Sequence, residues 1–173
     1  MSGMDTLNAA GRDGNGIVRA NSVLTGLFGV STLLAAALFD SPWKAVAVVV
    51  DVVCFTVGVV AFLWGYWNAV QRSREEEIGV AALYFLLDGI APRGVAVRMN
   101  SMLAFQVVWA VTTAIWRGST NGKPGSTLAF GVLVPMLGLG LNGLWGAFHG
   151  TFGPRVGKGR HGVSHGDDRN GQD

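Results

Sequence analysis

The sequence predicts an all-α integral membrane protein: a bundle of four transmembrane helices, with a short cytoplasmic interfacial helix between the second and the third. Of its 173 residues, 50% are hydrophobic and only 14% are charged, whereas soluble domains carry about 25% charged residues. The mean hydropathy is +0.39. Four almost uncharged stretches explain this composition, each close to the roughly 20 residues that cross a bilayer. The expected spans are residues 21–39, 45–67, 99–116 and 126–152.

The two ends of the chain differ from the region between them. Residues 1–16 and 154–173 are polar and glycine-rich and show no periodic apolar face. Segments of this kind bury too little apolar surface to offset the entropy lost on ordering. We therefore predict disordered cytoplasmic tails at both ends, with a four-span domain over residues 17–153.

The first span contains the run LTGLFGVSTLLAAALFD, which is apolar and has small residues near Ala35 and Ala37. A cleaved signal peptide shares these features, but its apolar region usually has about 7–15 residues. This run is longer. A retained transmembrane helix is therefore favoured, with cleavage as the alternative.

The second span contains the stretch VVVDVVCF, in which Asp51 is the only formal charge within the four spans. Positions alternately four and three residues apart share one face of a helix. The face that includes Asp51 is small or polar throughout, comprising Ala47, Asp51, Cys54, Gly58, Ala61, Gly65 and Asn68. Membrane helices pack through small residues and turn polar groups inward. This face is therefore predicted to contact other helices or a partner.

The acid itself needs an explanation, because an ionised carboxylate in hydrocarbon is costly unless it has a partner. Three roles for Asp51 are open: a proton or ion site, a hydrogen bond within the bundle to Asn142, Gln106 or a hydroxyl, and pairing with a basic residue of another subunit. No second acid or histidine shares this face at a similar depth. The hydrogen-bonded role is therefore favoured.

The segment after the second span has helix signals but is too short to cross a bilayer. Ser73 and Glu76 form a capping-box pattern, and Gly89 followed by Pro92 is a stop signal. The uncharged run between them, residues 78–87, would be about 15 Å long as a helix. We therefore predict an interfacial helix over residues 74–88.

The fourth span repeats the small-residue pattern of the second. Its small or polar positions recur at intervals of four: Gly138, Asn142, Gly146 and Gly150, with Gly143 and Ala147 as a second pair. Pro135 is predicted to kink this helix near its start. Asn100 and Gln106 on the third span are candidate polar partners for the same interior. The second and fourth spans are therefore predicted to carry the main helix–helix or partner contacts.

Aromatic and basic residues predict how the chain sits in the membrane. Aromatic rings favour the headgroup level, and the predicted anchors are Trp43, Trp64, Trp67 and Trp116. Ten of the thirteen lysines and arginines lie before the first span, between the second and the third, or after the fourth. The positive-inside rule then places both termini in the cytoplasm of a multi-pass plasma-membrane protein.

No residue pattern points to an enzyme, a metal site or a cofactor site. The run GSTNGKPGST differs from a phosphate-binding loop in its spacing and has Pro124 after the lysine. His161 and His165 lie near two aspartates, but the surrounding glycines oppose a helix that would gather them. The pI near 9.0 comes from loops and tails without a nucleic-acid-binding motif. We therefore expect no catalytic residue, no metal, no cofactor and no nucleic-acid partner.

Two longer runs carry a resemblance to a family. WNAVQRSREEEIGVAALYFLLDGIAPRGV and LAFGVLVPMLGLGLNGLWGAFHGTFGPR resemble an uncharacterised actinobacterial family of small four-span membrane proteins. The resemblance covers about Val23 to Arg155 and leaves out both tails. It implies an accessory subunit of a mycobacterial lipid-uptake transporter of the mammalian-cell-entry (MCE) type, beside the permease, and no activity is carried over.

These observations lead to one expected function and one alternative. We expect a non-catalytic accessory subunit that contacts membrane lipids and packs against a larger membrane complex, with an MCE-type lipid or fatty-acid importer as the specific case. The alternative is a small homo-oligomeric transporter or channel that uses Asp51 as a proton or ion site.

Overall fold

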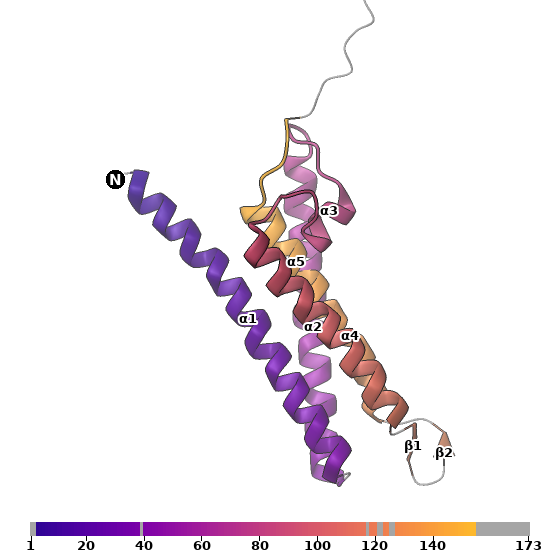
Figure 1. Ribbon diagram of the computed structural model, residues 1–173. Coiled ribbons are helices and arrows are strands. Elements are labelled where there is room, and N and C mark those ends of the chain that lie inside the picture. The colour runs from indigo at the N-terminus through magenta and orange to yellow at the C-terminus, as the bar shows by residue number, and fades with distance from the viewer. Residues whose placement is uncertain (1–2, 39, 117, 121–122, 125–126, 155–173) are drawn as a thin grey trace, which may run out of the picture.

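Four long helices, each antiparallel to the one before it in the chain, form the computed structural model, which describes residues 3–38, 40–116, 118–120, 123–124 and 127–154 (Figure 1). The long helices are α1 (Gly3–Leu38), α2 (Ser41–Arg72), α4 (Arg93–Trp116) and α5 (Pro135–His149). The shorter elements are α3 (Val80–Phe85), the paired strands β1 (Ser119–Thr120) and β2 (Lys123–Pro124), and the 3₁₀ helix η1 (Thr127–Leu133).

The prediction of an all-α bundle with four spans is confirmed. The segments long and apolar enough to cross a membrane are Gly14–Leu38, Pro42–Arg72, Arg93–Trp116 and Leu128–His149. Their outward surfaces carry many exposed Val, Leu, Phe and Trp side chains, as expected where lipid is the solvent. The chain is therefore a multi-pass membrane protein.

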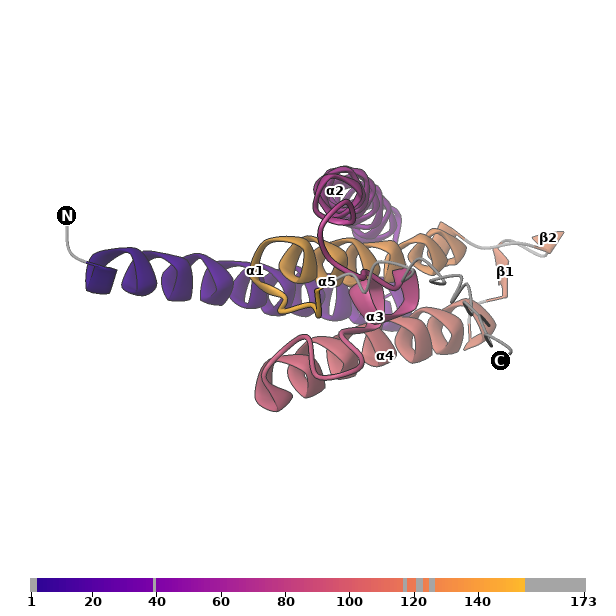
Figure 2. The ribbon, with the colours of Figure 1, turned by 90° about the horizontal axis from the view of Figure 1, so that it is seen from above.

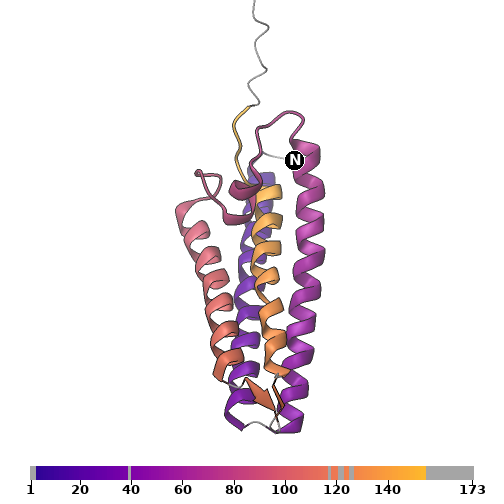
Figure 3. The same ribbon diagram turned by 90° about the vertical axis from the view of Figure 1, so that its right-hand side faces the viewer.

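Helix α5 is the central helix of the bundle. It contacts α1, α2, α3 and α4, and its contact with α2 is the most extensive between any two described elements. Figures 2 and 3 show α5 among the other long helices rather than at an edge. The main hydrophobic core accordingly includes Leu137, Leu141 and Trp145 of this helix.

Helix α1 is close to the bundle at one end and leans away at the other (Figures 1 and 2). Near its C-terminal end, Ala35 and Ala36 form a buried cluster with Ala47 of α2 and Leu128 of η1. Small side chains allow this close approach. Toward its N-terminal end, α1 diverges from α4 and α5.

The bundle has two distinct ends. The start of α1, the end of α5 and helix α3 lie toward one end, called here the terminal end, whereas the β1–β2 hairpin marks the other, called here the hairpin end (Figure 1). Both described ends of the chain therefore lie on the same side of the four spans.

Two predicted boundaries are wrong: the end of the N-terminal tail and the start of the third span. Residues 3–16 are not a disordered tail, because α1 continues without a break back to Gly3. Helix α4 begins at Arg93 rather than at residue 99. The carbonyl of Pro92 accepts hydrogen bonds from the N–H groups of Val95 and Ala96, which form the first turn of the helix. Residues 155–173 of the other predicted tail lie outside the described residues.

The predicted interfacial helix over residues 74–88 is also wrong in extent, since α3 covers only Val80–Phe85. Ser73 caps the C-terminal end of α2 instead of starting a new helix. Glu76 forms a β-bridge with Pro154, and the N–H of Glu77 donates to the carbonyl of Gly153 at 3.0 Å. These contacts hold the segment before α3 against the chain that follows α5, so it is not helical.

The fourth span is discontinuous. Residues 127–133 form η1, and α5 starts afresh at Pro135. Proline lacks the N–H of a continuous helix but suits the first turn of a new one. The expected kink at Pro135 is therefore a junction between two kinds of helix.

Candidate functional site

The buried face shared by α2 and η1–α5, called here the α2–α5 seam, includes Ala47, Gly58 and Gly65 of the face predicted on α2. Six of the seven residues of that predicted face are buried and the seventh is half-buried. Two glycines allow the helices to touch along their backbones. A Cβ at Gly58 would lie 2.5 Å from the backbone nitrogen of Leu137, and one at Gly65 would lie 2.9 Å from the carbonyl carbon of Gly143.

The glycines of α5, three of them predicted and Gly140 not, face three different neighbours. Gly140 faces the carbonyl of Gly58 on α2, and Gly138 faces Gln106 on α4. Gly143 faces the ring of Tyr84 and Gly146 faces Leu83, both on α3. Close approach on several sides therefore explains why α5 is so rich in glycine.

Asp51 lies in the seam, fully buried, where α1, α2 and η1 meet. Its Oδ2 and the ring of Phe28 both lie within 4 Å of the position that a Cβ would occupy at Gly131. Neither carboxylate oxygen has a hydrogen-bond partner among the described residues. A charge in this position would have neither a counter-ion nor a donor there, which is costly in a bilayer.

The favoured role of Asp51, a hydrogen bond within the bundle to Asn142, Gln106 or a hydroxyl, is therefore wrong for the described part of the chain. Both amides bind other groups, as the next two clusters show. Pairing with a basic residue of another subunit is also disfavoured, because Asp51 is 0% exposed.

The first polar cluster joins α1, α4 and α5. The Nε2 of Gln106 donates to Thr25 Oγ1 at 2.7 Å and to Asn21 Oδ1 at 3.3 Å. Its Oε1 accepts a hydrogen bond from the backbone N–H of Gly138 at 3.1 Å. All three side chains are buried. One side chain of α4 therefore holds three helices together.

The second polar cluster joins α3, α4 and α5. The Nδ2 of Asn142 donates to the Oδ1 of Asn100 at 2.9 Å and to the carbonyl of Tyr84 at 3.1 Å. The Nδ2 of Asn100 donates to the carbonyl of Phe85 at 2.6 Å. The carbonyls at the end of α3, which a short helix leaves without partners, are thus bound by the two amides.

Tyr84 also fixes α3 against α2. Its hydroxyl donates to the carbonyl of Phe62 at 3.2 Å, and the two rings stack with centroids 4.4 Å apart. Burial, with a smaller contribution from Tyr66, raises the pKa of Tyr84 to about 12. The phenol therefore stays protonated and remains a donor at neutral pH.

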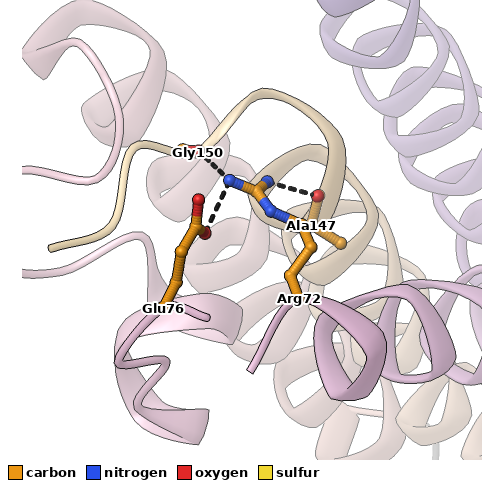
Figure 4. Close-up of polar contacts among 4 residues, drawn as sticks. All are labelled: Arg72, Glu76, Ala147 and Gly150. Atoms are coloured by element: carbon orange, nitrogen blue, oxygen red, sulfur yellow. Dashed lines mark hydrogen bonds and ion pairs between the residues drawn. The ribbon is translucent and has the colours of Figure 1, made fainter. Parts of the chain in front are cut away.

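Arg72 closes the terminal end of α5 (Figure 4). Its guanidinium donates to the carbonyls of Ala147 at 2.7 Å and Gly150 at 3.2 Å, and it pairs with Glu76 at 2.7 Å. It also lies over the ring of Phe152 at 5.3 Å. The last carbonyls of α5 carry partial negative charge, so this arginine both caps the helix and fixes the segment after it.

The four predicted aromatic anchors all have exposed side chains. Trp43 and Trp64 lie at opposite ends of one helix, about 32 Å apart along its axis, which matches a hydrocarbon core of about 30 Å. His149, near the terminal end, stacks on Trp145 with ring centroids 5.5 Å apart and lies against Gly14 of α1.

An apolar groove of about 520 Å³ follows the outer side of α4. Ala104 and Val108 form its α4 wall, and Phe85, Pro135 and Leu139 form the opposite wall. Of the four spans, α4 is the least buried within its own bundle. The groove therefore leaves this helix open to a neighbour.

Sequence reasoning missed Asn21, Thr25, Arg72 and Tyr84. The pair Asn21 and Thr25 had a signal, since two polar residues one turn apart in an apolar span point to a shared polar contact. Arg72 and Tyr84 had none, because their partners are backbone carbonyls far away in the sequence.

Comparisons with protein-family models, curated proteins and solved structures give no match for this chain. The family resemblance and the partner it implies therefore stay predictions.

Proposed function

We propose that the chain is a non-catalytic integral membrane accessory subunit that packs laterally against a larger membrane complex. The observation that carries this proposal is that the amide side chains between the helices are all bound to groups of the chain itself. Gln106, Asn142 and Asn100 each hydrogen-bond groups on neighbouring elements. Groups committed in this way stabilise one arrangement of helices, as suits a packing subunit.

The open side of α4 supports a site for the partner. The groove beside Ala104 and Val108 is apolar, and the small side chain of Ala104 would let a foreign helix approach closely. We assign this groove to a transmembrane helix of the partner. The finer proposal, a permease of an MCE-type lipid importer, rests on the sequence resemblance alone.

The proposed orientation places both ends of the chain in the cytoplasm of the plasma membrane. It is supported by the excess of basic residues at the terminal end. Labelling of single cysteines introduced at Arg74 and at Ser119 with a membrane-impermeant reagent tests it. In intact cells the cysteine at 119 is expected to react and the cysteine at 74 to be protected.

Purification from native membranes in mild detergent tests the partner. The wild-type chain is expected to carry a larger membrane protein in a fixed ratio, identified by mass spectrometry. Ala104→Phe, which fills the groove, is expected to lose it. Val52→Phe, on an exposed face of α2, is the matched control and is expected to keep it. Recovery of the wild-type chain alone would refute the proposal, and recovery of a complex other than a lipid importer would refute only its finer form.

Asp51 supports a second candidate function, a small transporter or channel with a proton or ion site. The supporting observation is a fully buried carboxyl with no described partner, which is by default a functional feature in a membrane span. Purified protein in liposomes would then move protons or cations by itself. Asp51→Asn is expected to abolish this flux without changing the yield of folded protein. Flux at the level of empty liposomes would exclude this candidate.

A further inference from the structure

A second groove, of about 560 Å³, lies between α1 and α4. It lies beside the polar cluster in which Gln106 of α4 binds Asn21 and Thr25 of α1. Its α1 wall is one face of the helix, with Ser22, Gly26, Gly29 and Leu33 at intervals of four, three and four. A Cβ at Gly26 would meet nothing within 4 Å, so this wall is open.

The α4 wall is aromatic along much of its length. Phe105 and Trp109 stack with ring centroids 5.5 Å apart and an interplanar angle of 17°. A Cβ at Gly29 would lie 3.5 Å from the Phe105 ring, which closes the base of the groove. The result is a narrow apolar channel with a flat side, suited to an acyl chain.

One arginine lines the terminal end of this groove, and helical spacing puts a second one turn beyond it on α1. Arg98 begins the α4 wall, and its Nη2 donates a long hydrogen bond of 3.5 Å to Ser22 Oγ. Arg19 lies one turn before Ser22 on the same face of α1, and both arginines are exposed. Among the described residues, the one ion pair within 4.0 Å joins Arg72 to Glu76. Both guanidinium groups therefore have donors to offer to an anion, and phosphate accepts them in a forked geometry.

The length of the groove matches one leaflet. Arg98 and Trp109 are about 16 Å apart along α4, roughly half of a 30 Å hydrocarbon core. Beyond this depth α1 closes onto α2 through Ala35 and Ala36. A transmembrane helix would need a longer surface. One lipid molecule fits, with its headgroup at the arginines and an acyl chain in the apolar groove, which reaches about half-way across the hydrocarbon core.

We propose that the α1–α4 groove binds one anionic phospholipid from the leaflet at the terminal end. Its phosphate lies between Arg98 and Arg19, and one acyl chain runs past Gly26 and Phe105. This site is on the opposite side of α4 from Ala104, so it does not depend on the proposed partner.

Lipid retention by the purified full-length chain tests the charge. The protein is reconstituted in nanodiscs that contain equal amounts of phosphatidylglycerol and phosphatidylcholine with identical acyl chains, and lipid kept after detergent extraction is counted by native mass spectrometry. The wild type is expected to keep one phosphatidylglycerol in preference. Arg98→Gln is expected to lower this retention about fivefold, as for removal of one cation at an anionic membrane surface. Arg93→Gln, at an exposed position in the first turn of the same helix, is expected to change it little.

Filling the groove tests the channel separately. Gly26→Leu is expected to lower retention of both lipids, whereas Gly16→Leu, also on α1 with nothing within 4 Å, is expected to have no effect. Both variants are checked for the size-exclusion profile of the wild type. Equal retention of the two lipids by the wild type, or equal behaviour of the variants and their controls, would overturn the proposal. So would a photo-cross-linker at position 33 that captures a polypeptide rather than a lipid in native membranes.

Discussion

The backbone N–H of Gly138 donates a hydrogen bond to Oε1 of Gln106 at 3.1 Å, so a side chain of α4 completes the first turn of α5. The first turn of a helix leaves its N–H groups without partners inside the helix. In a bilayer, water is absent as a substitute. Close to the break at Pro135, a neighbouring helix therefore supplies an additional acceptor to the backbone of α5.

Removing this side chain is expected to destabilise the bundle. Gln106→Leu leaves Gly138, Asn21 and Thr25 without their shared partner, and we expect a loss of about 1–2 kcal/mol of unfolding free energy. Denaturation by SDS in mixed micelles, followed by circular dichroism, measures it. The control is Thr112→Val at an exposed position of α4, expected within about 0.5 kcal/mol of wild type. An unchanged Gln106→Leu would show that the cluster contributes no stability.

The close approach of α2 and α5 at Gly58 gives the second expectation. In Gly58→Ala the new methyl group would lie 2.5 Å from backbone atoms of Met136 and Leu137, which no side-chain rotation relieves. We expect destabilisation of about 1–3 kcal/mol. Gly26→Ala, on an open surface, should be neutral or slightly stabilising. Thermal unfolding in mild detergent compares them, and equal melting temperatures would contradict the close packing.

The third expectation concerns Arg72. Replacing it by Ala removes the hydrogen bonds to Ala147 and Gly150 and the ion pair with Glu76. We expect faster hydrogen exchange in the last turn of α5 and in residues 150–154, measured by mass spectrometry. Arg72→Lys should restore this only in part, because an ammonium cannot fork between two carbonyls as a guanidinium does. Arg74→Ala, an exposed neighbour, is the control and should match wild type.

High pH should weaken the attachment of α3 through Tyr84. The unfolded chain loses this phenolic proton near pH 10, whereas the folded chain holds it to about 12. Stability is therefore unaffected below pH 10 and falls as the pH rises from 10 to 12, by up to about 2–3 kcal/mol. The measurement is the difference in unfolding free energy between wild type and Tyr84→Phe across this range. Tyr66→Phe, at a side chain that is 48% exposed, removes only the smaller cause of the raised pKa and should keep most of this fall, and parallel curves for wild type and Tyr84→Phe would exclude the effect.

The cost of burying Asp51 can be measured directly. Asp51→Val replaces a carboxyl that lacks described partners by an apolar group of similar size, and we expect stabilisation of about 1–3 kcal/mol. Asp51→Asn keeps the unpaired polar atoms and should remain within about 1 kcal/mol of wild type. Thermal unfolding in detergent distinguishes the two variants. A destabilised Asp51→Val would mean that the carboxyl has a partner in the native membrane.

Much of this architecture could be predicted from local sequence, and the failures have a common cause. Hydropathy and helical spacing predicted the four spans and a small, polar face on α2, because both depend on residues close together in the chain. The helix predicted from Ser73 failed because Glu77 and Glu76 bind residues 153 and 154, nearly eighty positions away. Asp51 was assigned partners by composition alone. Its true surroundings depend on where η1 lies, and the presence of Pro135 in the sequence did not specify that the residues before it form a separate 3₁₀ helix.

The central position of α5 has a consequence for biogenesis. The ribosome makes this helix last of the four, yet α2, made second, has its most extensive contact with it. While the chain is still being inserted, the glycine face of α2 has no partner from its own bundle and faces lipid or the translocation machinery. Assembly must therefore wait until α5 has been synthesised, and chains truncated before α5 are expected to expose a face that membrane proteases and chaperones can recognise.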